Sequence, residues 1–298
     1  MFRPLALLTL AVLTLSGSAA AATFSGASAF EFTKQSVEFG PRASGSEANR
    51  KLQAFIIGQL QKDGCEPAQS KKTDCELIDD SFTATTPRGS VPMKNIIAKF
   101  PGKSGKAIVI AGHFDTKLFP GRKFVGANDG GSSTGLLLEL AHVLAHQPRV
   151  DDVYVVFFDG EEAVGEWSDN DSVYGSRHLA ARWQKDGLLP KVKAFILVDM
   201  IGDKSLDIKR ESKSNAALTS LVWDAAADLG YAANFLNQSI DIEDDHLPFL
   251  KLGVPAIDII DFNYPPWHTD ADTMDKIGAQ SLEIVGKVVV EAIHRLER

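Results

Sequence analysis

The feature that most constrains this chain is an alternation of short apolar runs with longer amphipathic ones, starting near residue 91. Five runs are compact and apolar, as buried strands are: residues 96–100, 107–110, 153–158, 194–198 and 256–260. Four longer runs carry helical periodicity: residues 135–145, 176–184, 216–229 and 280–296. Alternating strands and helices favour parallel pairing, and continuously apolar strands are buried on both faces. We therefore expect an α/β fold: a three-layer α/β/α sandwich around a mixed, mostly parallel central sheet.

Two other segments precede this pattern. Residues 30–60 are mostly helical in pattern, around a break at Gly40 and Pro41. Residues 1–22 have the features of a secretory signal peptide, with Arg3, an apolar core over residues 5–15 and small residues up to Ala22. That core is shorter than the roughly 20 residues that cross a bilayer. We predict cleavage near Ala22, a secreted or periplasmic location, no membrane span, and one domain over residues 23–298.

The charge and the cysteines narrow the function further. The chain has 31 basic and 39 acidic residues, a net charge of −8, and its longest basic cluster is Lys71 and Lys72. A protein that binds nucleic acid through its phosphates needs a basic patch, so we exclude nucleic acid as a partner. Cys65 and Cys75 flank a polar loop and form no Cys-x-x-Cys motif. In an oxidising compartment we expect them to form a disulfide bond rather than a metal site or a nucleophile.

Histidine and carboxylate side chains follow the apolar runs, where the carboxyl ends of parallel strands meet at one edge of a sheet. These residues are His113 and Asp115, then Asp159, Glu161 and Glu162, then Asp199, and finally His268; Asp129 precedes a Gly-Gly helix start. So many carboxylates repel one another in a dry cleft unless a cation compensates them. Mixed histidine and carboxylate ligands suit Zn²⁺. Because adjacent side chains diverge, one of Glu161 and Glu162 can bind the metal while the other acts as acid or base.

At these residues the sequence resembles the zinc-dependent aminopeptidase superfamily, whose metal set runs His-x-Asp, Asp, Glu-Glu, Asp, His. Within it, the chain is more similar to the glutaminyl cyclases, over nearly all of residues 23–298. The matching segments are FGPRASGS (39–46), HFDTK (113–117), FFDGEEA (157–163) with Trp167, DSVYGSRHLA (171–180), EDDHLPFL (243–250), GVP (253–255) and WHT (267–269). The last three segments are typical of the cyclases rather than of the peptidases.

The resemblance implies an enzyme that converts the N-terminal glutamine of peptides to pyroglutamate and releases ammonia. It implies one Zn²⁺ per chain, held by Asp129, Glu162 and His268. Glu161 would be the acid/base, joined by short hydrogen bonds to Asp199 and Asp244. A substrate pocket would be shaped by Trp167, Tyr264 and Trp267, with Glu162 at its edge. We expect the enzyme to be a monomer that acts on peptide or protein substrates.

Two alternatives stay open at this point. In a two-zinc aminopeptidase the same set would bind a second ion through His113 and Asp199, with Asp129 bridging the two. Residue identity does not exclude this enzyme, although Trp167 and the segment 244–246 have no clear purpose in it. A binding protein that keeps the fold would have lost at least one of the ligands or the acid/base, and none is lost.

Overall fold

The structure is a computed structural model that describes residues 23–68 and 73–298, so the predicted signal peptide lies outside the described residues. The helices are α1 (Gly26–Val37), α2 (Glu47–Lys62), α3 (Gly131–Ala145), α4 (Tyr174–Lys185), α5 (Ala216–Asp228), α6 (Leu247–Lys251) and α7 (Ala279–Leu296), with 3₁₀ turns η1 (Leu189–Lys191) and η2 (Met274–Lys276). The strands are β1 (Glu66–Pro67), β2 (Glu76–Thr86), β3 (Gly89–Phe100), β4 (Ala107–His113), β5 (Asp152–Phe158), β6 (Val192–Asp199), β7 (Ile208–Glu211), β8 (Phe235–Ile240) and β9 (Ala256–Ile260).

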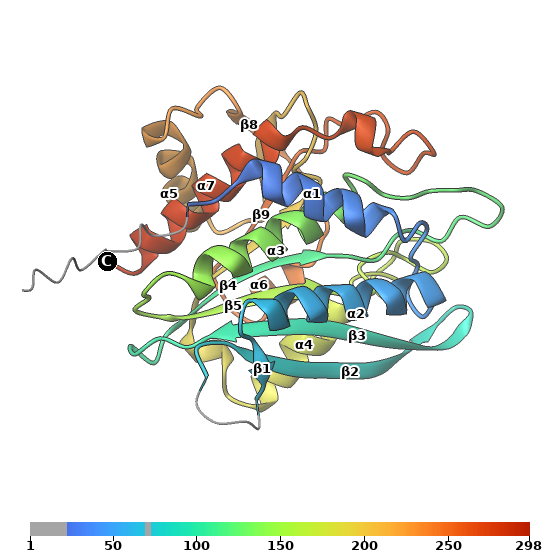
Figure 1. The fold of residues 1–298 in the computed structure, drawn as a ribbon, viewed down its shortest axis with the longest axis horizontal. Coiled ribbons are helices and arrows are strands. Elements are labelled where there is room, and N and C mark those ends of the chain that lie inside the picture. Colours follow the sequence, from blue (N-terminus) through green and yellow to red (C-terminus); the bar gives the residue numbers. More distant parts are fainter. Residues whose placement is uncertain (1–22, 69–72) are drawn as a thin grey trace, which may run out of the picture.

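Seven strands form the central sheet, in the order β1-β2-β3-β5-β4-β6-β9 (Figure 1). The four strands β5, β4, β6 and β9 pair in parallel, whereas β3 is antiparallel to both β2 and β5. The parallel half places four carboxyl ends at one edge, where the loops after these strands meet. The expected mixed, mostly parallel sheet is confirmed.

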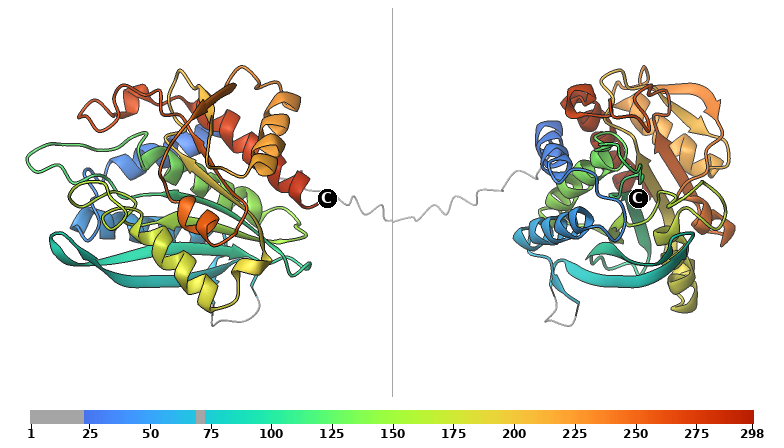
Figure 2. Two further views of the ribbon diagram at one scale, coloured as in Figure 1. Left: turned by 180° about the vertical axis from the view of Figure 1, so that it is seen from behind. Right: turned by 90° about the vertical axis from the view of Figure 1, so that its right-hand side faces the viewer.

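Helices cover both faces of this sheet, so the molecule has three layers. Residues from α1, α2, α3, α5 and α7 form one core with Ile108 and Ile110 of β4, while α4 and α6 form a second core with Val109 and Ala111 of the same strand. Figure 1 looks onto the layer with α1, α2 and α3, and the left view of Figure 2 shows α4 and α6 on the opposite side. Every residue of β4 is buried, and those before its terminal His113 carry no polar side chain, so both faces of the strand can lie within a core.

The antiparallel edge of the sheet was not predicted from the sequence. The sequence pattern predicted a strand at residues 96–100, but β3 begins at Gly89 and pairs with β2 over eleven positions, from Glu76 opposite Lys99 to Thr86 opposite Gly89. Most side chains of β2 are exposed or half-buried, so this strand lacks an apolar run that would reveal it. The small parallel pair of β7 and β8 was missed for the same reason, since β8 buries only Phe235.

Two further expectations are met near the N-terminal half of the chain. Cys65 and Cys75 form a disulfide bond, which joins the end of α2 to the start of β2. The predicted helical break lies between α1 and α2, from residue 38 to residue 46. Across residues 23–68 and 73–298, every helix is too short or too polar to cross a membrane.

Candidate active site

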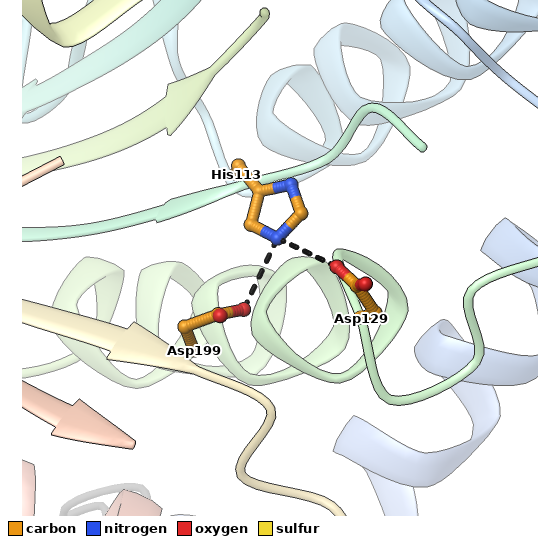
Figure 3. A group of neighbouring side chains, drawn as sticks. All are labelled: His113, Asp129 and Asp199. Carbon is orange, nitrogen blue, oxygen red and sulfur yellow. Dashed lines mark hydrogen bonds and ion pairs between the residues drawn. The ribbon is translucent and has the colours of Figure 1, made fainter. Parts of the chain in front are cut away.

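The loops at the carboxyl edge of the sheet bring the predicted polar residues together. His113 is the last residue of β4 and Asp199 is the last residue of β6, so two neighbouring strands present them side by side. Asp129 lies two residues before helix α3, and Figure 3 shows its carboxylate and that of Asp199 facing the same ring nitrogen of His113. Strand geometry therefore fixes one part of the site and a helix start fixes another.

These side chains form two clusters that share Asp129. In the first, His113 Nε2 lies 3.1 Å from Asp199 Oδ1 and 3.2 Å from Asp129 Oδ1. In the second, His268 Nε2 lies 3.2 Å from Glu162 Oε1 and 3.3 Å from Asp129 Oδ2. Each cluster offers three ligand atoms within 4.8 Å of one another. We call them the inner triad (His113, Asp129, Asp199) and the outer triad (Asp129, Glu162, His268).

The donor set of both triads fits a divalent metal ion. Histidine with carboxylates is a common zinc environment. Buried polar atoms normally have hydrogen-bond partners, yet Asp129 Oδ2 and His113 Nδ1 make no hydrogen bond, although Asp129 Oδ2 lies within ion-pair distance of His268. An ion between Asp129, Glu162 and His268 would satisfy this Asp129 oxygen.

A cavity of about 340 Å³ opens onto the complete outer triad and onto two members of the inner triad, Asp129 and Asp199. All three members of the outer triad line it, together with Glu161, Asp199 and Asp244 on the polar side. The remaining lining residues are Trp167, Met200, Asp241, Ile242, Glu243, Ile260, Phe262 and Trp267. His113 does not line the cavity, and its side chain is 1% exposed. The cavity therefore combines a triad that could hold a metal ion, several further carboxyl groups and an apolar wall.

The electrostatics of the cavity separate the two adjacent glutamates. Burial raises the pKa of Glu161 well above its usual range; His113 opposes this shift, while Glu162 and Asp244 add to it. Burial and the charge of Asp129 raise the pKa of Glu162 to about 7. Both groups hold protons more readily than exposed carboxyls do, which suits an acid/base and favours a bound cation beside them.

The pKa values of His113 and His268 are raised as well, which in a histidine favours the charged form. Burial lowers the pKa of His268, but its contacts with Asp129 and Glu162 outweigh burial and raise that pKa to about 9. Burial likewise opposes a charge on His113, and the carboxylates of Asp199 and Glu161 raise its pKa well above the usual value. Without a cation, protons on the histidines thus balance the carboxylates of the site.

Backbone contacts set the positions of the two glutamates. Asp115 accepts hydrogen bonds from the backbone N–H groups of Glu161 (3.1 Å) and Glu162 (3.3 Å). The backbone N–H of Lys117 donates to Glu162 Oε1 at 3.0 Å. The aspartate of the His-x-Asp motif therefore lies behind the site as a support for the Glu-Glu pair, and its side chain is 1% exposed.

Sequence reasoning assigned no role to Arg42 or Asp272, which hold the loop that carries Asp129. The guanidinium of Arg42 is fully buried and donates to the carbonyls of Phe114, Val125 and Gly126. Asp272 accepts the backbone N–H groups of Asn128 (2.8 Å) and Asp129 (3.2 Å). Arg42 lies within the segment 39–46 that matched the cyclases, whereas nothing in the sequence pointed to Asp272.

The structure departs from the expected site at two places. Tyr264 does not line the cavity, because its side chain is buried and its hydroxyl donates to Asp272 at 2.7 Å. The short hydrogen bonds expected between Glu161 and the two aspartates are also not found among the described residues. Asp199 Oδ1 instead accepts the Met200 N–H and faces His113, and Asp244 Oδ1 accepts the Asp245 N–H.

The comparisons with known proteins agree with this geometry. Residues 95–293 match Peptidase family M28. The glutaminyl-peptide cyclotransferase of Drosophila melanogaster is 30% identical over 264 residues, which are 80% of this chain and 72% of that protein.

Among solved structures, the chain is similar to a glutaminyl cyclase of an Acidobacteriales bacterium, with 42% identity, a TM-score of 0.86 and coverage of 96% of this chain and 99% of that one. A Zn-dependent exopeptidase from Parabacteroides distasonis is 27% identical, with a TM-score of 0.79 and coverage of 92% and 99%. The chain therefore belongs to peptidase family M28, in the group of the glutaminyl-peptide cyclotransferases.

Proposed function

We propose that this protein converts the N-terminal glutamine of peptides to pyroglutamate and releases ammonia. The observation that carries the proposal is the position of Glu161, a buried carboxyl group in the same cavity as the outer triad and two tryptophans. The names of the relatives support the same reaction, since glutaminyl cyclase is the name given to the structure with 42% identity.

The reaction needs one group that both accepts and donates a proton. The α-amine attacks the side-chain amide carbon, a C–N bond forms, and the bond to the amide nitrogen breaks. The proton that leaves the amine must reach the departing nitrogen so that ammonia is released. Glu161 is the group that we assign to this transfer, because a carboxyl with a raised pKa is matched to proton exchange near neutral pH.

The other groups of the cavity position the substrate. We propose that Asp129, Glu162 and His268 hold one Zn²⁺ per chain, which when bound supplies Lewis-acid polarisation of the amide carbonyl. Trp167 and Trp267 would pack on the glutamine side chain and favour the folded conformer that closes the ring. Asp244 would act on Glu161 through its charge rather than through a direct hydrogen bond.

The inner triad favours a second candidate, a two-zinc aminopeptidase. Its three ligand atoms lie as close together as those of the outer triad, and Asp129 would bridge the two ions. In that enzyme Glu161 would deprotonate a water molecule that attacks the backbone carbonyl of the first residue. The resemblance to a Zn-dependent exopeptidase fits this alternative.

A single assay separates the two enzymes. The purified protein is incubated with a peptide that begins with glutamine and, separately, with leucine amide, while mass and free ammonia are followed. Ammonia release from the peptide with leucine amide intact is the expected result, and release of free leucine would instead support the peptidase. The zinc content per chain gives an independent answer: one ion for the cyclase and two for the peptidase.

We also propose that residues 1–22 are a signal peptide and that residues 23–298 form one exported, monomeric domain. The disulfide between Cys65 and Cys75 supports export, because such bonds persist in oxidising compartments. Mass spectrometry of the protein recovered outside the cytoplasm should place the new N-terminus at residue 23. Light scattering of the purified protein would test the monomer.

A further inference from the structure

His268 has a backbone conformation that needs support from its surroundings. Its φ is +54°, in the left-handed region, which residues other than glycine seldom adopt. Such a conformation costs on the order of 1–3 kcal/mol and persists only where neighbouring groups fix it. His268 lies in a loop beyond β9, in a turn that the Thr269 N–H closes by donating to the Pro266 carbonyl at 3.0 Å. Contacts from outside this turn add to that support.

Arg122 makes those contacts from the loop between β4 and α3. Its Nη2 donates to the backbone carbonyl of His268 at 3.2 Å, and its Nε lies 3.1 Å from Asp270 Oδ1. The same guanidinium stacks over the ring of Phe119, with 4.5 Å between the guanidinium carbon and the ring centroid. One planar group thus connects the His268 backbone to an aromatic side chain of a different loop.

Three aromatic rings enclose the imidazole of His268. Phe119 and Phe124 meet it edge to face, with centroids 5.5 and 5.7 Å away, and Trp267 stacks on it at 4.1 Å. Its Nε2 remains directed at Asp129 and Glu162, within 3.3 Å of both. The orientation of this nitrogen therefore depends on the backbone bond from Arg122 and on the ring that Arg122 stacks on.

We propose that Arg122 is a positioning residue for the outer triad, which holds His268 so that its Nε2 is ready to bind the metal ion. This inference rests on the metal site of the proposed function but not on the reaction performed there. The ion pair with Asp270 is not the source of the effect, because both side chains are exposed, at 40% and 54%, and such pairs contribute little. Arg122 acts through the His268 carbonyl and through Phe119.

The test measures metal binding without turnover. Zinc affinity is determined by competition with a chromophoric chelator for the wild type and for the variants Arg122→Gln, Arg122→Lys and Asp270→Asn. Loss of an outer-shell partner typically lowers metal affinity about 10- to 100-fold. We expect zinc affinity to fall at least about tenfold in Arg122→Gln. It should also fall clearly in Arg122→Lys, because lysine lacks the planar guanidinium that can hydrogen-bond and stack on a ring at the same time. Asp270→Asn should stay within about twofold of the wild type.

Cobalt substitution adds a spectroscopic test. The visible spectrum of bound Co²⁺ reports ligand geometry, and both Arg122 variants should change it while Asp270→Asn leaves it unaltered. Thermal unfolding of the metal-free proteins identifies any variant that fails to fold, and Arg210→Gln controls for the loss of an arginine stacked on an aromatic ring elsewhere, on Trp223. Unchanged affinity in Arg122→Gln, wild-type affinity in Arg122→Lys, or an equal loss in Asp270→Asn overturns the proposal. None of these outcomes depends on whether the enzyme is a cyclase or a peptidase.

Discussion

The inner and outer triads share Asp129 and contain similar ligands, but they meet the solvent differently. The His268 side chain of the outer triad is 23% exposed and borders the cavity, whereas the His113 side chain of the inner triad is 1% exposed and lies behind it. A catalytic metal ion must keep one coordination position open to the substrate. All three members of the outer triad line the cavity, whereas His113 of the inner triad does not, so we expect the outer triad to be the one that holds a catalytic ion.

The two triads also differ in what holds them. His113 and Asp199 end adjacent parallel strands, so the sheet itself fixes their separation. His268 lies on a loop in a left-handed conformation and relies on contacts from other loops. The inner triad is thus built into the core of the sheet, whereas His268 of the outer triad is placed by loops, which contacts with other segments must hold in position.

The largest expected effect compares the two histidines directly. His268→Gln should lower kcat/KM on a glutamine peptide about a thousandfold, because the metal contribution of several kcal/mol is lost. His113→Gln should stay within about tenfold, because the outer triad remains complete. Zinc content of each variant is measured in parallel. Equal losses in the two variants would mean that both ions are needed, as in a two-metal peptidase.

In the metal-free protein the order of the two effects should be reversed, with His113→Gln lowering the free energy of unfolding more than His268→Gln. His113 is buried against Asp199 and Asp129, and its removal takes away the buried histidine that compensates the Asp199 carboxylate and one of the two histidines beside Asp129. Urea unfolding of chelator-treated His113→Gln should show a free energy of unfolding about 3–5 kcal/mol lower. For His268, whose side chain is 23% exposed, we expect a loss of about 1 kcal/mol or less. A similar loss in both variants would contradict the distinction between a core position and a loop position.

The adjacent glutamates provide the third test. Glu161→Gln should reduce turnover about a hundredfold or more while zinc stays bound, because it removes proton transfer and leaves all three outer ligands. Glu162→Gln is the matched control and, unlike Glu161→Gln, should lose both turnover and zinc. If Glu161→Gln is the variant that loses zinc, the two roles have been assigned in the wrong order.

The smallest effect is the pH dependence of zinc binding. A proton on His268 competes with the metal, and its pKa in the metal-free protein is raised to about 9. Apparent zinc affinity should therefore fall up to about tenfold per pH unit below pH 9 and level off above it. The decline should steepen below about pH 7, where Glu162 also takes up a proton. His268→Gln should lose the dependence above pH 7, and a wild-type profile in that variant would exclude His268 as the competing group.

The sequence predicted the parallel half of the sheet well and the rest poorly. Strands such as β4 are buried on both faces, so their apolar runs stand out from the surrounding sequence. Strand β2 buries few side chains and β8 buries one, so their pairing depends on partners that the local sequence does not reveal. The same holds for the site. Residues at the ends of apolar strands were predicted from the sequence. Asp272, which accepts a hydrogen bond from the Asp129 backbone more than 140 residues earlier in the chain, was not.

The sequence by itself determined the fold class, the disulfide partners and the set of metal-binding residue types, because apolar periodicity and side-chain chemistry are local properties. Only the tertiary structure decided that Asp129 joins two triads, that His268 faces the cavity while His113 does not, and that Tyr264 supports the site from within the core. The physical reason is that exposure and ligand distance depend on how segments far apart in the chain pack together. His113 and His268 are the same residue type, and it is their position in the packed fold that gives them different environments.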